Sequence, residues 1–423
     1  MITQQLHKSF ASTFPDSGEP RFFYAPGRVN LIGEHIDYNG GYVFPCALTL
    51  GTYAAISRRD DNTVRLVSGN FGPAVTITTD DLQFDPAHKW ANNPKAIIKL
   101  LTDMGHKIGG FDLYIWGNLP GAAGLSSSAS INVLVTLALD ALYEVNMSPV
   151  DRALLSQRAE NEYLGVNCGI MDPFASAMGK KNHAILLNCG SLEYDQVPLE
   201  LGDYRLMLAN TNKPRALADS KYNERRTECD KALGILRSIC DIENLCDLEF
   251  DEQFIDISKK AFGEDAVNHV ISMATTKKCT NMSNEHIKLK PEEIAFKRAY
   301  HAVSENTRVK KAVDMLRRGD LAAFGSAMSD SHTSLRDFYE VTGDELDALV
   351  LAANELDVSN NKVLGSRMTG AGFGGCTVSI VHKNNVDEFI CEVGMRYTKM
   401  TGLSADFYVA ETDDGAREIC AHV

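Results

Sequence analysis

Short apolar runs, separated by clusters of Gly, Asn and Asp, dominate the first half of the chain and predict β-strands. Between them lie longer segments in which apolar residues recur every three or four positions, a pattern typical of helices. The predicted strands are 21–24, 42–50, 63–67, 74–78, 111–116, 184–187 and 204–208, and the predicted helices are 129–143, 148–164 and 220–240. The first half is therefore predicted to be a mixed α/β domain.

The second half has a mostly helical pattern that returns to strands near its end. Pro291, followed by two glutamates, predicts a helix start, because Pro fits the first helical position and acids favour the positive end of the helix dipole. We expect this helix to end at Gly319. Strand-like runs follow at 377–381 and 405–410. The segment 241–290, acidic and then rich in Asn, Thr and Lys, is predicted to be a peripheral helical elaboration.

Length and composition indicate a globular protein of two or three domains. The chain has 423 residues, of which 44% are hydrophobic and 23% charged, and domains usually hold roughly 100–200 residues. We predict an N-terminal domain at 1–200 and a C-terminal domain at 201–423. The formal net charge of −14 disfavours broad binding to nucleic acid or to anionic membranes.

Neither the cysteines nor the apolar segments indicate export or a membrane anchor. The ten cysteines form no C-x-x-C pair, which excludes a zinc-ribbon spacing and is typical of reduced thiols in a cytoplasmic protein. Residues 1–10 lack the apolar core of a signal peptide. The long uncharged stretch 113–139 is interrupted by Pro120, three glycines and four serines, so we do not expect it to span a membrane.

The segment 118–130, NLPGAAGLSSSAS, follows a predicted strand and leads into a predicted helix. Gly121 and Gly124 allow close backbone approach to a ligand. The successive serines place hydroxyls and amides at a helix N-terminus, where the dipole favours an anion. The pattern predicts a phosphate cradle, although without the Lys of a Walker loop. The alternative is a serine-capped helix after a glycine turn.

The segment 27–42, GRVNLIGEHIDYNGGY, concentrates polar side chains between glycines. Arg28, Glu34, His35 and Asp37 would be costly to bury without partners but suit a polyhydroxylated ligand. Their spacing is not that of a zinc-binding helix. The alternative is a solvated loop with a chance ion pair.

The segment 365–376, GSRMTGAGFGGC, contains a G-x-G-x-x-G match at Gly370, Gly372 and Gly375. A dinucleotide fingerprint follows a strand and opens a helix, whereas this segment precedes the predicted strand 377–381. We therefore reject that interpretation. The glycines predict a loop in close contact with another loop or with a ligand phosphate.

In the segment 168–174, CGIMDPF, Asp172 precedes a proline. Because Pro173 disfavours the helical conformation in the residue before it, we expect Asp172 to be extended, with its carboxylate projecting from an irregular segment. Glu160 lies twelve residues upstream in a predicted helix. The alternative is a simple Asp-Pro turn.

Together with SKYNERR at 220–226, these motifs resemble the galactokinase branch of the GHMP small-molecule kinases over residues 21–376. The resemblance implies an α+β, two-domain GHMP kinase fold with a mixed-sheet N-terminal domain, an α/β C-terminal domain and the active site between them. It also implies ATP and Mg²⁺ as cofactors. The implied reaction transfers the γ-phosphoryl group to the anomeric hydroxyl of D-galactose, giving galactose 1-phosphate and ADP, the first committed step of the Leloir pathway. The implied partners are small molecules, with no obligate protein partner.

The resemblance further implies residue roles that have a physical rationale. Asp172 would orient or deprotonate the anomeric hydroxyl, with the Arg28 cation offsetting charge on the phosphoryl group. Ser128 and Glu160 would supply hard oxygen ligands to Mg²⁺. The implied sugar-binding residues are Glu34, His35, Asp37, Gly169, Asp172 and Tyr222, and the implied nucleotide-binding residues are Trp90, Gly121, Gly124, Leu125, Ser126, Ser127 and Ser128, with Trp90 near adenine.

Three alternatives stay open at this point: an N-acetylgalactosamine kinase, a non-catalytic sensor of galactose and ATP, and a mevalonate- or homoserine-type kinase that shares only the serine loop. The chain also departs from the family pattern. Ala122, Pro173 and Pro214 replace the usual residues, and the segment 241–290 is longer than expected. We expect these departures to affect rates and affinities more than the reaction class.

Overall fold

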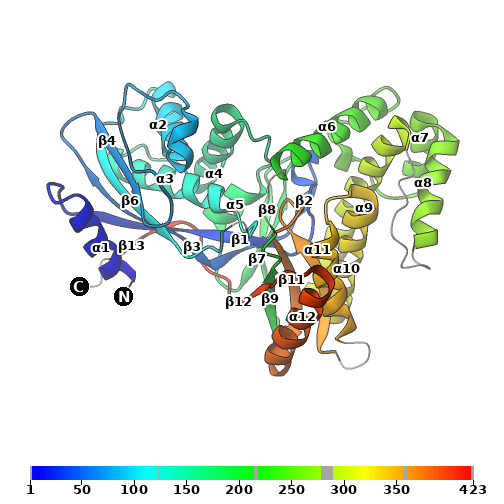
Figure 1. Ribbon diagram of the computed structural model, residues 1–423. Coiled ribbons are helices and arrows are strands. Elements are labelled where there is room, and N and C mark those ends of the chain that lie inside the picture. Colours follow the sequence, from blue (N-terminus) through cyan, green and yellow to red (C-terminus); the bar gives the residue numbers. More distant parts are fainter. Residues whose placement is uncertain (1, 122, 214–217, 278–288, 357–360, 421–423) are drawn as a thin grey trace.

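The computed structural model describes residues 2–121, 123–213, 218–277, 289–356 and 361–420. Figure 1 shows two lobes, with strands β1, β3, β4 and β6 in one and helices α9–α12 in the other. The strands are β1 (Arg21–Asn30), β2 (Tyr42–Val43), β3 (Pro45–Arg58), β4 (Thr63–Ser68), β5 (Val75–Thr78), β6 (Phe111–Gly117), β7 (His183–Asn188), β8 (Tyr194–Pro198), β9 (Tyr204–Asn210), β10 (Val363–Thr369), β11 (Cys376–His382), β12 (Asp406–Ala410) and β13 (Arg417–Ile419). The α-helices are α1 (Ile2–Thr13), α2 (Asn92–Asp103), α3 (Ser127–Tyr143), α4 (Pro149–Arg158), α5 (Met171–Met178), α6 (Ala218–Arg237), α7 (Glu252–Phe262), α8 (Glu264–Lys277), α9 (Pro291–Arg317), α10 (Leu321–Ser334), α11 (Asp344–Glu355) and α12 (Val386–Thr401).

The N-terminal lobe is built on a mixed six-stranded sheet of order β13-β1-β3-β6-β4-β5. Strands β4 and β6 are parallel and the other pairs antiparallel, as the predicted mixed sheet requires. Successive side chains of a strand point to opposite faces. Accordingly Phe22 packs with Phe10 of α1 on one face, whereas Phe23 joins the cluster under α2 and α3 on the other.

The C-terminal lobe is built on an antiparallel four-stranded sheet of order β10-β11-β9-β12. Helices α11 and α12 cover one face through a cluster that includes Met207 and Val381. The opposite face, including Leu208 and Ile380, packs with residues of α9 and α10. Helix α9 begins at Pro291 and ends before Gly319, as predicted. The α+β class is confirmed.

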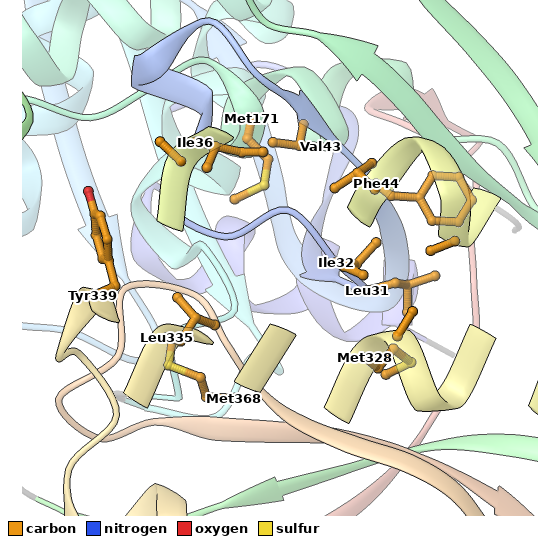
Figure 2. Packing of buried hydrophobic residues seen from close by; sticks show 14 of the residues in the cluster. Leu31, Ile32, Ile36, Val43, Phe44, Met171, Met328, Leu335, Tyr339 and Met368 are labelled. Carbon is orange, nitrogen blue, oxygen red and sulfur yellow. The ribbon is translucent and has the colours of Figure 1, made fainter. Parts of the chain in front are cut away.

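One hydrophobic cluster joins the two lobes (Figure 2). Leu31 and Ile32, which follow β1, lie near Met328 of α10 in this view, and Met368 of β10 belongs to the same cluster. Burial of a side chain of this size stabilises by roughly 1.5–3 kcal/mol. The shared apolar burial therefore fixes the segment after β1 between the lobes.

The end of the chain returns to the N-terminal sheet, where β13 pairs with β1. An isolated bridge between Leu48 and Thr412 precedes it. We propose that the boundary at 200/201 separates the main bodies of the two domains, and that the last segment, from about 412, completes the first domain.

Some predicted elements need correction. The predicted strand 42–50 divides at Phe44, because Phe44 N donates to Ile32 O and its own carbonyl accepts from Leu31 N. The first five residues of the predicted loop 365–376 are part of β10, so the loop itself is 370–375. Helices α1 and α2 were not predicted. In the segment 241–290, α7 and α8 are helical as expected.

Asp172 is not extended as predicted but lies in the first turn of α5. Pro173 is tolerated there because the first backbone N–H groups of a helix have no intrahelical acceptor.

Ala122 and Pro214, two of the departures from the family pattern, lie outside the described residues. The cysteines that the structure describes are free thiols. Within the same part of the chain, no helix has both the length and the apolarity that crossing a membrane requires.

The contact between α10 and β10 leaves no room for a side chain. A Cβ at Gly365 would lie 2.0 Å from Gly325 O, so Gly365→Ala must push the helix from the strand. We expect it to lower the free energy of unfolding by about 1–3 kcal/mol, measured by chemical denaturation. Gly234→Ala, at an exposed helical position with nothing within 4 Å, is the control and should stabilise by up to about 1 kcal/mol. Equal stability of the two variants would contradict this packing argument.

Candidate active site

A cavity of about 420 Å³ lies where the motifs meet. Its walls come from the segment after β1, the serine loop, the residues around Asp172, and Gly370 and Ala371 of the 370–375 loop. The predicted site residues in its lining are Arg28, Glu34, His35, Asp37, Gly124, Leu125, Ser126, Ser127, Ser128, Glu160, Gly169, Asp172 and Tyr222. The structure thus brings together residues from both lobes.

Arg28 and Asp172 form a two-pronged ion pair in this cavity. Arg28 Nε donates to Asp172 Oδ1 at 2.8 Å and Nη2 donates to Oδ2 at 2.9 Å. The Arg28 side chain is 4% exposed, whereas that of Asp172 is 31% exposed. Paired charge-assisted hydrogen bonds of this kind fix orientation as well as charge. Asp172 is therefore held rigidly while its carboxylate stays accessible from the cavity.

The serine loop is tied to the same ion pair. Arg28 Nη1 donates to Gly124 O at 2.7 Å, and Ser126 Oγ donates to Asp172 Oδ2 at 2.5 Å. Ser126 adopts a left-handed conformation, with φ 63°, immediately before α3 begins at Ser127. The Ser126 hydroxyl is thus directed at Asp172, and the backbone amides at the start of α3 are the groups of the loop that could hold an anion.

Ser128 and Glu160 lie side by side on the lining of the cavity. Ser128 Oγ donates to Glu160 Oε1 and lies 3.0 Å from Asn93 Oδ1. Asn132 Nδ2 donates to the same Glu160 oxygen at 2.9 Å. Glu160 occupies a one-turn π-helix, Ala159–Leu164, that follows α4; such turns are frequent at functional sites.

This pair fits Mg²⁺, although it could not hold the ion alone. Mg²⁺ is commonly bound by one or two protein oxygens together with phosphates and water. The hydroxyl of Ser128 and the carboxylate of Glu160 supply that donor set. Among the described residues, no group of three or more His, Cys, Asp and Glu side chains could form an all-protein metal cage.

Both ring nitrogens of His35 are engaged by protein groups. Nε2 donates to Ala371 O, 3.1 Å away, and Nδ1 is 2.8 Å from the Tyr38 hydroxyl. Burial lowers the pKa of His35 to about 3, so the ring is neutral and Nδ1 accepts from Tyr38. Tyr38 in turn lies 2.8 Å from the hydroxyl of Tyr339. The His35 side chain thus holds the 370–375 loop in place while also lining the cavity, and its contact with sugar stays a prediction.

Asp37 and Gly169 are in close contact on one side of the cavity lining. A Cβ at Gly169 would lie 1.9 Å from Asp37 Oδ2, so glycine is required for this approach. Burial, followed by the charges of Asp172 and Glu34, raises the pKa of Asp37 to about 7. The ring of Tyr222 lies 5.5 Å from that of His35 and closes the same side.

Two predicted nucleotide residues lie outside this cavity lining. Trp90 is buried in the N-terminal core, where Nε1 donates to Pro73 O at 3.1 Å. Gly121 is exposed on the serine loop, next to Pro120, which does line the cavity. Their proposed contacts with nucleotide stay predictions.

Family models match this chain in three segments. The galactokinase galactose-binding signature matches residues 8–58, the GHMP kinases N-terminal domain matches 92–180, and the GHMP kinases C-terminal domain matches 312–398. A galactokinase of Fusobacterium nucleatum is 47% identical over 99% of this chain and 100% of its own length. The chain belongs to the galactokinase family.

Other relatives agree with this assignment. A galactokinase of Bacillus subtilis is 46% identical, with 99% of both chains covered. The crystal structure of Lactococcus lactis galactokinase complexed with galactose is 40% identical, with a TM-score of 0.86 and coverage of 99% of this chain and 100% of that one. Methanococcus jannaschii mevalonate kinase, at 17% identity and a TM-score of 0.59 over 94% of this chain and 99% of its own, shares the fold.

Several supporting residues of this galactokinase-family site were not identified from the sequence. Asn132 follows Ser128 by one helical turn, and this i, i+4 spacing could have placed it beside the Ser128–Glu160 pair. Tyr339 and Asn93 gave no such signal, because their motifs are unremarkable and only the folded chain brings them to His35 and Ser128.

The raised pKa of Asp37 predicts a pH-dependent contribution to stability. A carboxyl whose pKa is higher in the folded state than in the unfolded state loses stability as pH rises between the two values, from about 4 to about 7. Asp37→Asn removes this loss, so its melting temperature relative to wild type should increase from pH 5 to pH 8. Thermal unfolding at four pH values measures this trend.

The control for this experiment is Asp256→Asn, at an exposed position on α7. Its melting temperature relative to wild type should not vary with pH. A difference between Asp37→Asn and wild type that is the same at pH 5 and pH 8 would contradict the assignment of a raised pKa to Asp37.

Proposed function

We propose that this sugar kinase transfers the γ-phosphoryl group of ATP to the anomeric hydroxyl of D-galactose, giving galactose 1-phosphate and ADP. One observation carries the proposal. The polar side chains within the galactose-binding signature, the N-terminus of α3 and Asp172 line a single cavity. A sugar and a nucleotide phosphate bound in this cavity would meet at Asp172.

The chemistry requires an acceptor-side carboxylate and charge neutralisation, since phosphoryl transfer depends mostly on positioning and electrostatics. In our proposal Asp172 accepts the proton of the anomeric hydroxyl or orients it. Arg28, bonded to both carboxylate oxygens, holds Asp172 in place and offsets negative charge that develops nearby. The backbone amides of Ser127 and Ser128 hold the nucleotide phosphates.

We further propose that Ser128 and Glu160 hold Mg²⁺. When bound there, the ion would reduce the negative charge of the nucleotide phosphates. Asn132, which donates to Glu160 Oε1, would orient the carboxylate. Sugar selectivity would come from Glu34 and Asp37, since a site that hydrogen-bonds particular hydroxyls rejects an epimer that leaves its buried groups unpaired.

The alternatives make different predictions for the same assay. An N-acetylgalactosamine kinase would differ by the space around the sugar 2-position. A non-catalytic sensor would bind galactose and ATP without turnover, but Arg28, Asp172 and Ser128 are all present and converge on the cavity, which favours catalysis.

We also propose a cytoplasmic location, consistent with the free thiols of the described residues.

The decisive experiment is the initial rate of ADP formation with Mg²⁺-ATP and galactose, N-acetylgalactosamine, glucose or mevalonate. Galactose should be turned over preferentially, and NMR should locate the phosphate on its anomeric carbon. Binding of galactose and ATP without turnover would instead establish the sensor, and preferential turnover of N-acetylgalactosamine would establish the other kinase.

Asp172→Asn should lower kcat by on the order of 10²-fold or more, because it removes the acid–base group while preserving the shape of the side chain. Circular dichroism and ATP binding should stay near wild type. Asp256→Asn serves as the matched control and should leave kcat unchanged. Retention of wild-type kcat by Asp172→Asn, or loss of the fold, would favour a structural role for Asp172.

Glu160→Gln should raise the concentration of Mg²⁺ needed for half-maximal activity, because an amide oxygen is a weaker ligand than a carboxylate. Titration of Mg²⁺ at fixed ATP measures this shift. Glu162→Gln is a suitable control, since Glu162 lies on the same π-helix but pairs with Arg158. An unchanged Mg²⁺ requirement in Glu160→Gln would remove Glu160 from the metal site.

A further inference from the structure

Arg367, on β10, is a fully buried arginine whose hydrogen-bonding groups are incompletely used. Its Nη1 donates to Asn30 O at 3.0 Å, while Nε and Nη2 have no hydrogen-bond partner among the described residues. Unpaired buried donors cost free energy. A neutral donor could supply the single bond to Asn30, so the property that distinguishes arginine at this position is its positive charge.

Glu34 lies next to this charge and lines the cavity. Arg367 Nη1 is 3.7 Å from Glu34 Oε1. The same oxygen accepts from Gly370 N at 2.6 Å and lies 3.1 Å from Thr369 Oγ1. These contacts from β10 and its loop converge on Oε1, so Oε2 is the carboxylate oxygen that we assign to a ligand hydroxyl.

We propose that Arg367 is a positioning residue for galactose, whose charge keeps the buried carboxylate of Glu34 ionised and fixed so that Oε2 can accept a sugar hydroxyl. This inference rests on the proposed function and extends it to a residue that does not line the cavity. At 3.7 Å the contact is too long for a hydrogen bond. Arg367 therefore acts on Glu34 through charge, which has a strong effect in a buried environment.

The other charged groups around Glu34 do not replace Arg367. Burial raises the pKa of Glu34, and Arg367 opposes this more strongly than Arg28 does. Asp37, a like charge on the adjoining turn, has its own pKa raised in part by Glu34. His301 of α9 donates to Glu34 O, but burial lowers its pKa to about 4, so it adds no charge at neutral pH.

A second carboxylate, Glu305 of α9, shares the surroundings of Arg367 but has its own partners. It accepts hydrogen bonds from Gly33 N at 3.0 Å and Ser331 Oγ at 2.5 Å, and it pairs with Arg308. Arg308 thus compensates Glu305, which leaves the charge of Arg367 to act chiefly on Glu34.

The test compares KM for galactose, KM for ATP and kcat in wild type, Arg367→Lys and Arg367→Gln between pH 6 and pH 9. Arg367→Gln should raise KM for galactose about tenfold or more at pH 7, since a rise of one pKa unit lowers the ratio of ionised to protonated carboxyl tenfold. This KM should fall as pH rises and Glu34 ionises. In Arg367→Gln, KM for ATP should stay within about twofold of wild type. In Arg367→Lys, KM for galactose and KM for ATP should both stay within about threefold of wild type.

A double-mutant cycle with Glu34→Gln isolates the charge effect. Once residue 34 is neutral, adding Arg367→Gln should change KM for galactose by less than about twofold, because coupled residues give non-additive effects. Arg298→Gln is the matched control. Arg298 is equally buried but pairs with Glu228 and Glu340 away from the cavity lining, so both KM values should stay near wild type.

The proposal would be overturned if Arg367→Gln and Glu34→Gln had multiplicative effects on KM for galactose in the double variant. A rise in KM for galactose in Arg367→Gln that does not depend on pH would overturn it as well. If Arg367→Gln fails to fold, Arg367→Lys decides: near-wild-type KM supports a charge role, and a tenfold rise with an unchanged pH profile overturns it. Galactose binding measured by calorimetry gives the same comparison without turnover. An inactive wild-type enzyme would therefore overturn the proposed function alone, while the dissociation constants would still decide the role of Arg367.

Discussion

The site depends on the burial of one polar segment, residues 30–44, between two lobes. Leu31, Ile32 and Phe44 anchor it in the shared hydrophobic cluster, which removes its backbone and polar side chains from water. Each buried polar group must then find a partner. The C-terminal lobe supplies them: Glu305 accepts from Gly33 N, Asn306 accepts from Tyr42 N, and Gly370 N donates to Glu34. Apolar burial thus sets the position of the segment, and hydrogen bonds set its detailed geometry.

The same burial explains the electrostatics of the cavity. Glu34, Asp37 and Asp172 are acidic groups near one another, and burial adds to their mutual repulsion at Asp37. Arg28 and Arg367 offset this charge from two sides, the former by direct hydrogen bonds and the latter at longer range. An acidic chain with a net charge of −14 can therefore bind an anionic nucleotide only through a local arrangement of cations and backbone amides.

The structure also requires backbone segments to approach one another closely. Gly169 lies against Asp37, and Gly370 brings its backbone against Gly124 of the serine loop, where an added Cβ would lie 2.7 Å from the carbonyl oxygen. The serine loop and the 370–375 loop are therefore in contact across the two lobes. This contact explains why glycines are dense in two motifs far apart in the sequence.

The sequence by itself determined the fold class, the family and most residues of the cavity, because apolar periodicity, helix-start signals and motif chemistry are local properties of the chain. It located Arg28, Asp172, Glu160 and the serine loop without contact information. The tertiary structure alone decided that Asp172 lies in the first turn of a helix, that both His35 ring nitrogens contact protein groups, and that Trp90 packs in the core. It also decided that Arg367 lies behind Glu34. The contacts of His35 and Arg367 join residues more than 300 positions apart, and a partner that distant leaves no local pattern in the sequence.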